Sequence, residues 1–309
     1  MPATVRAGER RFRGEPAVEL TAGEVSAVFV PGLGMTGVSL RHDGAEHLAL
    51  PGGLDALRAG HTTGLPLLAP WANRLSGRRY RAAGVRVDLT GRPVGVDGNG
   101  LPIHGLLIGR AGWSVDRLDA RRETASVRAS IDVDAVEFPF PHRIEVTASV
   151  RRAQLRVDTT ITALGRRPVP IAIGWHPYLR LPGTARSRWR LHLPARRHLT
   201  LDARGIPDGT ATRERAEAGA VGTRTFDNLY ELGRDRRLAF SSDDGRSIEL
   251  HCGPGYPFAQ VWVPKGRSFA ALEPMAAPTN ALVDGGTPLA RRGEPFTATF
   301  TLTLDRQAR

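Results

Sequence analysis

The chain has 309 residues, of which 41% are hydrophobic and 24% are charged. This composition supports a sizeable core and excludes a chain that is disordered throughout. No apolar run approaches the roughly 18 to 20 residues that cross a bilayer, and no apolar stretch follows the first charges, so we expect a cytoplasmic protein without a membrane partner. The single cysteine, Cys252, excludes an internal disulfide and a cysteine-rich metal site.

The charge is unusual, because 43 basic residues face 31 acidic ones and give a formal net charge of +12. All of the basic residues except Lys265 are arginines. Arginine suits phosphate and carboxylate, so a nucleic-acid partner has to be considered. The arginines, however, occur as pairs spread over the whole chain, with acidic residues among them. We therefore expect a charged surface and no nucleic-acid partner.

Short strands dominate the pattern along the chain. The 35 glycines and 23 prolines interrupt it frequently, and between them apolar and polar residues alternate with the period of half-buried strands. The clearest case is the last, where apolar residues alternate with four threonines. The predicted strands are residues 24–30, 125–133, 143–150, 154–163, 189–193, 247–251, 258–263 and 295–304.

Helical periodicity is weak. Residues 53–59 and 213–220 could each form a turn or two, and neither shows three turns of apolar residues. Residues 184–222, rich in Arg, Gly and Ala, are interpreted as loops. The predicted fold is therefore all-β, a large antiparallel β-sandwich of two sheets packed face to face, with few short helices. We expect one domain over residues 1–309.

The apolar run LLAPWANRL, residues 67–75, contains Asn73 and Arg74. An arginine among buried neighbours needs an acceptor, and an Asn-Arg pair beside an indole suits a polyhydroxylated ligand. This setting separates Arg74 from the other arginines. The alternative is a structural arginine that fixes the loop by donating to backbone carbonyls.

Two histidines are candidates for a site. His104 lies in GNGLPIHG, where a histidine bonded to a backbone carbonyl is the commoner case. His176 follows a short apolar strand in IAIGWHPYL, between Trp175 and Tyr178. Because the end of a strand holds side chains rigidly at a cleft, His176 is the better functional candidate.

Two carboxylates interrupt apolar patterns. Glu273 closes the run SFAALEP, where a carboxylate must be paired, bound to a ligand or raised in pKa by desolvation. Asp227, in TFDNLYEL, is a weaker candidate, because Asp-Asn is also typical of a turn.

The motifs PWANRL, PIHG, GWHPYL, FDNLYEL and FAALEP follow one another between Pro70 and Pro274. In this combination and order, the sequence resembles the aldose 1-epimerase (mutarotase) family. The resemblance implies a β-sandwich of the galactose mutarotase type that binds a small-molecule aldose in a cleft on one sheet. It also implies an isomerase that needs no cofactor.

The resemblance implies roles for individual residues. Glu273 is similar to the family's general base, and His176 to its general acid. His104 corresponds to the second active-site histidine, and Asn73 with Arg74 to the sugar-binding pair. The remaining sugar-binding positions that it implies are Asp227, Tyr178 and, in FAQVWV, Gln260.

The chemistry of anomer exchange asks for residues of these types. A proton leaves the C1 hydroxyl while another reaches the ring oxygen, so that the ring opens to the aldehyde. We expect the base and the acid on opposite sides of the hemiacetal, separated by about the width of a sugar ring. Apolar surroundings would raise the pKa of Glu273, and His176, with a reference pKa of about 6.5, would donate at neutral pH. His104 and Arg74 would hold the ring oxygen and nearby hydroxyls.

Three alternatives stay open. A hexose-6-phosphate 1-epimerase would use additional basic residues, and a carbohydrate-binding protein without turnover would keep the cleft, although intact Glu273 and His176 argue against the second. A metal hydrolase would use His104, His176 and Glu273 as ligands, but they form no short metal-binding motif. We expect no metal, and a monomer or a homodimer.

Overall fold

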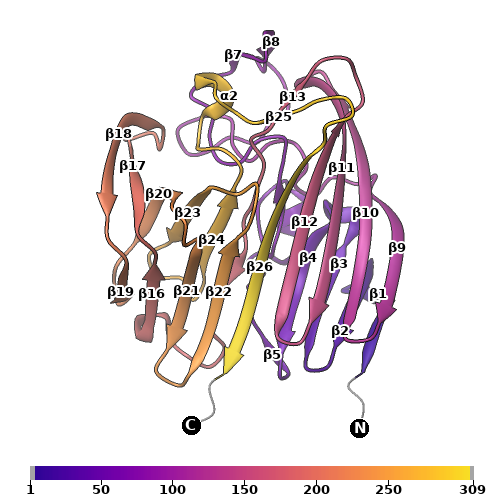
Figure 1. Cartoon of the computed structure of the whole chain (residues 1–309), viewed down its shortest axis with the longest axis vertical. Coiled ribbons are helices and arrows are strands. Elements are labelled where there is room, and N and C mark those ends of the chain that lie inside the picture. Colours follow the sequence, from indigo (N-terminus) through magenta and orange to yellow (C-terminus); the bar gives the residue numbers. More distant parts are fainter. Residues whose placement is uncertain (1–3, 307–309) are drawn as a thin grey trace.

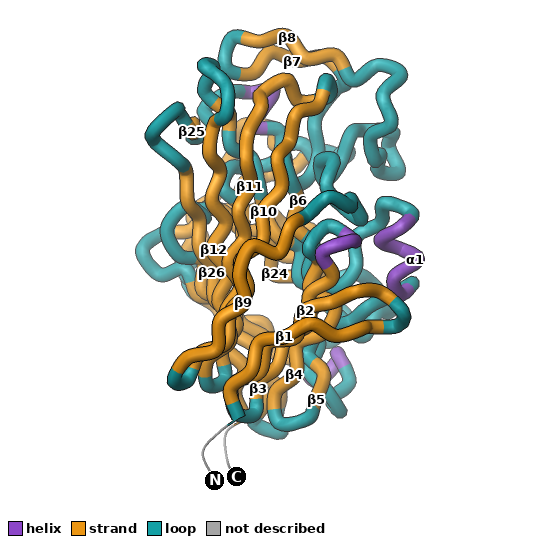
Figure 2. Tube along the Cα trace, turned by 90° about the vertical axis from the view of Figure 1, so that its right-hand side faces the viewer, coloured by secondary structure: helices purple, strands orange, loops and turns teal. Residues whose placement is uncertain are grey.

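Two layers of antiparallel strands face each other across an extended core (Figure 1). The computed structural model describes residues 4–306. One layer is a nine-stranded sheet, and the other contains an eight-stranded and a five-stranded sheet. Figure 2 shows the five-stranded sheet packed beside the nine-stranded one, with helix α1 (Gly53–Arg58) away from the long strands of the latter.

The nine-stranded sheet carries the longest strands. In spatial order it contains β19 (Glu217–Ala220), β16 (Trp189–Leu193), β21 (Arg237–Ser242), β22 (Arg246–Cys252), β26 (Phe296–Arg306), β12 (Gln154–Ala163), β11 (Phe138–Arg151), β10 (Thr124–Ala135) and β9 (Ser114–Arg121). Burial alternates along these strands, as in β10, where Val127, Ala129 and Ile131 are buried and the residues between them are not. One face of the sheet therefore forms the core.

The second layer is divided. Its eight-stranded sheet runs through β18 (Pro207–Glu214), β17 (Arg196–Leu201), β20 (Phe226–Leu232), β23 (Phe258–Val263), β24 (Ala270–Met275), β14 (Gly174–Trp175) and β6 (Leu67–Leu68), with β15 (Tyr178–Leu179) also paired to β24. Its five-stranded sheet contains β1 (Val5–Phe12), β2 (Glu15–Ala22), β3 (Val25–Val30), β4 (Thr36–His42) and β5 (Ala45–Glu46).

The remaining elements are small. They are the pairs β7 (Arg79–Ala82) with β8 (Val85–Asp88) and β13 (Val169–Pro170) with β25 (Leu289–Ala290), helix α2 (Ala281–Asp284) and 3-10 turns at Pro31–Leu33 and Arg186–Arg188. No helix within residues 4–306 is long and apolar enough to cross a membrane.

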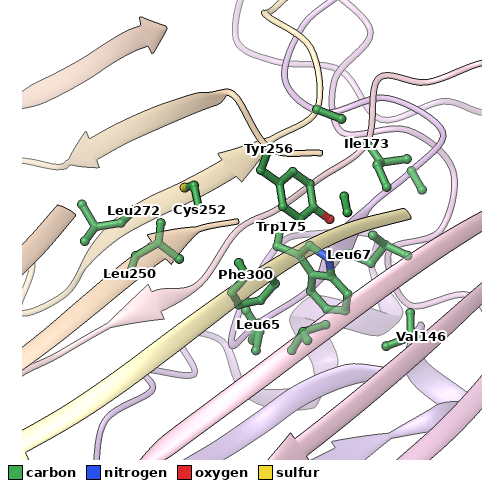
Figure 3. Packing of buried hydrophobic residues seen from close by; sticks show 14 of the residues in the cluster. Leu65, Leu67, Val146, Ile173, Trp175, Leu250, Cys252, Tyr256, Leu272 and Phe300 are labelled. Atoms are coloured by element: carbon green, nitrogen blue, oxygen red, sulfur yellow. The ribbon is translucent and has the colours of Figure 1, made fainter. Parts of the chain in front are cut away.

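Large aromatic side chains join the layers beneath the eight-stranded sheet (Figure 3). Trp175, at the end of β14, is fully buried and lies 5.8 Å from the ring of Phe300 on β26. Its Nε1 donates a hydrogen bond to Thr159 Oγ1 at 3.0 Å. Because side chains alternate across a strand, Trp175 on the core side sends His176 to the outer face.

The sequence predicted much of this architecture. Each of the eight predicted strands is present, with ends shifted by five residues at most, and residues 53–59 contain α1. The all-β sandwich with few short helices is confirmed.

Two local predictions are wrong. Residues 213–220 are not helical but form the end of β18 and all of β19. Residues 184–222, interpreted as loops, contain three strands besides the predicted one at 189–193. The reason lies in the β18 hairpin strand, whose residues are almost all exposed. A strand with no buried face has no apolar period that sequence analysis could detect.

Candidate active site

Strand register gathers polar side chains on the outer face of the eight-stranded sheet. Gln260 on β23 is paired with Glu273 on β24, and Trp262 with Asp227 on β20. Directly paired residues point to one face of a sheet, as do residues two apart on a strand. The four side chains therefore share the face opposite the core. Gln260 and Glu273 are buried there, with exposed fractions of 1% and 2%.

His176 meets Glu273 on this face. Its Nε2 lies 3.3 Å from Glu273 Oε1, and its ring stacks on Tyr178 with centroids 4.6 Å apart. The backbone N–H of His176 donates to the carbonyl of Pro66 at 3.1 Å. A Cβ at Gly174 would lie 2.9 Å from both the Ala72 side chain and a backbone oxygen, so a glycine lets these segments approach closely enough to form the site.

Two loops, which carry Asn73 and His104, bring His104 next to His176. His104 has a φ of 61° and Asn73 a φ of 55°, both in the left-handed region, which asparagine and histidine enter more readily than most residues. The N–H of His104 donates to the carbonyl of Asn73 at 3.0 Å. The His104 ring lies edge-on to His176, with centroids 5.6 Å apart.

Arg74 lies at the centre of a polar network. Its Nε donates to Asp97 Oδ2 at 2.7 Å, its Nη1 to Asn73 Oδ1 at 3.3 Å, and its Nη2 lies 3.8 Å from Asp227 Oδ2. Gln260 Nε2 donates to the other oxygen of Asp227 at 2.6 Å. The network therefore links the loop of residues 73 and 74 to strands β20 and β23.

Four buried polar atoms in this group have no hydrogen-bond partner among the described residues. They are His104 Nδ1, His176 Nδ1, Gln260 Oε1 and Glu273 Oε2. Buried polar atoms are nearly always hydrogen-bonded, so such a cluster marks a place where a ligand rich in hydroxyl groups can bind.

Burial controls the protonation of the central pair. It raises the pKa of Glu273 well above its usual value, with the charge of Asp227 adding to the rise and that of Arg74 opposing it. It lowers the pKa of His176 to about 3. Burial also lowers the pKa of His104, helped by His176 and Arg74. Both histidines are therefore neutral at neutral pH.

A cleft of about 630 Å³ opens next to Tyr178, on whose ring His176 stacks, although neither His176 nor Glu273 lines it. His104 and Tyr178 line it, together with Thr62, whose hydroxyl is 2.7 Å from the Tyr178 hydroxyl. No arginine or lysine is among the described residues that line this cleft. The stacking of His176 on Tyr178 places the pair next to this opening.

The structure brings all eight predicted site residues together, but in a different arrangement for the central pair. Glu273 and His176 are in contact instead of a sugar ring apart. Contact is compatible with the chemistry, because the C1 hydroxyl and the ring oxygen are bonded to the same carbon. His176 is expected to donate at neutral pH from its reference pKa of about 6.5, whereas burial lowers its pKa to about 3.

Sequence reasoning missed two residues of this group. Trp262 lies edge-on to His176 with centroids 5.5 Å apart, and the alternation along β23 signals it two positions after Gln260. Asp97 holds Arg74, but its sequence, VDGNG, looks like a turn. In residues 4–306, no group of three or more His, Cys, Asp or Glu side chains could hold a metal ion.

Comparisons with known proteins agree with this fold. The chain is similar to a galactose mutarotase-like protein from Clostridium acetobutylicum, with 18% identity, coverage of 98% of this chain and 99% of that one, and a TM-score of 0.87. It is also similar to a galactose 1-epimerase from Lactobacillus acidophilus, with 12% identity, coverage of 99% of this chain and 100% of that one, and a TM-score of 0.80. A third similar structure is a putative aldose 1-epimerase from Escherichia coli, with 18% identity, coverage of 94% of this chain and 98% of that one, and a TM-score of 0.74.

At these identities the similarity to solved structures shows the fold. Among curated proteins, no sequence matches this chain. The family is shown by a sequence model described as aldose 1-epimerase, which matches residues 16–303, nearly the whole chain. This chain belongs to the aldose 1-epimerase family.

Proposed function

We propose that this protein is an aldose 1-epimerase that interconverts the α and β anomers of a free aldose. The contact of 3.3 Å between Glu273 and His176, both buried beside a cleft and each with an unpartnered polar atom, carries this proposal. Membership of the aldose 1-epimerase family supports it.

In the proposed mechanism, Glu273 and His176 share one proton. One form of the pair is a carboxylate next to an imidazolium, which removes the proton of the C1 hydroxyl and gives a proton to the ring oxygen. The C1 to ring-oxygen bond breaks, the open aldehyde rotates about C1–C2, and reclosure gives the other anomer. After ring opening the pair is a carboxylic acid next to a neutral imidazole, the form that burial favours in the free protein. Reclosure then reverses both transfers, so the pair is regenerated without a cofactor.

This scheme explains why opposite pKa shifts are compatible with catalysis. The two forms of the pair contain the same number of protons, so their interconversion needs no exchange with solvent. Titration belongs to the pair as a whole, and we expect the form with one proton to be the active one. Activity should therefore fall as the pH rises above the raised pKa of Glu273.

The other polar residues would bind the sugar. Arg74, Asn73 and His104 present donors or acceptors from the loops, and Asp227 and Gln260 do so from the sheet. Side chains of these types bind sugar hydroxyls through paired donors and acceptors.

An aromatic wall adds a second kind of contact. Trp262 and Tyr178 lie edge-on to each other, with ring centroids 5.7 Å apart, and both contact the His176 ring. Aromatic faces suit the apolar face of a pyranose.

The decisive experiment is polarimetry on freshly dissolved α-D-glucose and α-D-galactose, with glucose 6-phosphate alongside. We expect the protein to hasten the approach to anomeric equilibrium of at least one free sugar. Tight sugar binding without acceleration would instead identify a carbohydrate-binding protein, and acceleration of the 6-phosphate alone would identify a hexose-6-phosphate 1-epimerase.

A further inference from the structure

The guanidinium of Arg74 is enclosed by two loops that are far apart in the sequence. One is the turn of residues 97–101, which follows β8, and the other is the turn of residues 202–206, between β17 and β18. Neither turn contributes a side chain to the eight predicted site residues. Both contact Arg74 directly.

Asp97 holds the guanidinium from one side. Its Oδ2 accepts from Arg74 Nε at 2.7 Å, and its side chain is only 7% exposed. Its other oxygen, Oδ1, accepts the backbone N–H groups of Asn99 and Leu101 at 2.9 and 3.0 Å. Because three donors fix the carboxylate, it aims Nε in one direction and turns the two terminal nitrogens toward Asn73 and Asp227, whose contacts with them are longer.

Gly205 closes the opposite side. A Cβ at this position would lie 2.9 Å from Arg74 Nη1, 3.1 Å from Cζ and 3.2 Å from Nε. The first contact is closer than real Cβ atoms essentially ever show and the other two are tighter than most, so a larger residue would push the guanidinium away. The φ of Gly205 is 74°, and Asp202 fixes the turn by accepting the N–H groups of Arg204 and Ile206.

We propose that Asp97 and Gly205 are positioning residues that fix the guanidinium of Arg74 beside Asn73 and Asp227, where it would bind the sugar. This inference rests on the proposed function, because it assigns Arg74 a defined contact with the sugar. Asp97 supplies the attraction and Gly205 the space, so that the terminal nitrogens keep one orientation before the sugar arrives. Such preorganisation strengthens binding by reducing the entropy lost on association.

A shift of Arg74 would also change the central pair. The charged and titratable groups around Glu273 are His176 and Tyr178 from the β14–β15 segment, Asp227 from β20, and Arg74. Of these, Arg74 opposes the rise in the Glu273 pKa. If the guanidinium moves away, that pKa rises further, and the alkaline limb of the activity profile moves to higher pH.

Two variants displace Arg74 by different means. Gly205→Ala adds a methyl group and no charge, and its matched control is Gly209→Ala in the same hairpin, where φ is 87° and no atom lies within 4 Å of the added Cβ. Asp97→Asn removes the carboxylate. Its control is Asp88→Asn at the exposed β7–β8 pair, where Asp88 likewise accepts from an arginine Nε and from a backbone N–H.

Kinetics separate positioning from a loss of folding. We expect Gly205→Ala and Asp97→Asn to raise KM about tenfold, the effect of losing a hydrogen bond to a charged group, with a smaller change in kcat. The alkaline limb of Gly205→Ala should move to higher pH, and both controls should match the wild type. A purely structural role would lower the active fraction, and thus kcat, without changing KM or the pH profile.

A second measurement does not depend on activity. In NMR spectra, the Nε–H of Arg74, assigned with Arg74→Lys, should exchange slowly with water in the wild type and at least about tenfold faster in Asp97→Asn, and its resonance should shift in Gly205→Ala. Unchanged exchange and an unchanged KM in folded Asp97→Asn would refute the positioning role. A wild type that accelerates no sugar would refute the proposed function, and the NMR result would still decide whether Asp97 and Gly205 fix Arg74.

Discussion

The replacement Glu273→Gln tests the central pair most directly, because it keeps the shape of the side chain and removes its ability to carry a proton. Glu273 is 2% exposed and touches His176 at 3.3 Å. A general acid–base group contributes about 10² to 10⁴ in rate, which corresponds to roughly 3 to 5 kcal/mol of barrier. We therefore expect polarimetry to show a loss of at least about a hundredfold.

The same replacement should not destabilise the protein. Burial raises the pKa of Glu273 in the folded state above the unfolded value of about 4.5. The favourable contribution of this carboxyl is therefore complete below that value and is lost as the pH rises toward the folded pKa. Glu273→Gln lacks this loss. The free energy of unfolding of the variant, relative to that of the wild type, should therefore increase by up to about 1.4 kcal/mol for each pH unit above 4.5.

Urea unfolding at pH 5, 6 and 7 measures this gain beside the polarimetric rates. The control is Glu249→Gln on β22, where the carboxylate is partly exposed and lies outside the cleft. Residual activity within threefold of the wild type would refute the role of Glu273. Parallel losses of activity and stability would show that the carboxylate supports the fold, and would refute the argument from burial.

Three further predictions follow from the geometry. His176→Asn should also lose at least about a hundredfold in rate. The pKa of His176 is about 3 in the folded protein and about 6.5 in the unfolded chain. The contribution of His176 to the free energy of unfolding is therefore complete above pH 6.5 and is lost as the pH falls toward 3. Because His176→Asn lacks this loss, its free energy of unfolding in urea titrations at pH 4 should exceed that of the wild type by up to roughly 3 kcal/mol. Trp262→Ala should raise KM about twofold to tenfold for free sugars in polarimetry, since it removes an aromatic wall. Exhaustive chelation should leave the polarimetric rate unchanged, and a loss restored by added metal would contradict the proposed mechanism.

The sequence revealed those parts of the fold that bury one face. Strand β12 has the predicted bounds, because its buried and less buried residues alternate over ten positions. Strands such as β18 stayed hidden, since an exposed hairpin carries no such alternation. The division of the second layer into two sheets was also not visible, because pairing between distant strands leaves no local pattern.

For the site, residue types were predictable and distances were not. Glu273 and His176 stood out because a buried strand and a strand end both carried a titratable group. Their contact at 3.3 Å depends on β14 pairing with β24, whose residues lie about a hundred positions apart. Gly205 gave no signal at all, since only the folded hairpin brings it next to Arg74.

Burial of an arginine does not by itself indicate a binding role in this arginine-rich chain. Arg196 is more enclosed than Arg74, with side-chain exposure of 3% against 18%. Its Nη2 pairs with Glu214 and Glu217 at 2.6 and 2.9 Å, and its guanidinium lies 4.7 Å over the ring of Tyr230. Protein atoms accept from both of its terminal nitrogens, and only Nε is without a partner, so we interpret Arg196 as structural.

Arg74 differs from Arg196 in the strength of the contacts that its terminal nitrogens make. Its one short bond, to Asp97, involves Nε, whereas the contacts of its terminal nitrogens with Asn73 and Asp227 are long, at 3.3 and 3.8 Å. A guanidinium carries five donors, so the terminal nitrogens of Arg74 keep donors without a strong acceptor. Unused capacity of its terminal nitrogens, and not charge or burial alone, is the property that would suit Arg74, rather than Arg196, to the proposed role in sugar binding.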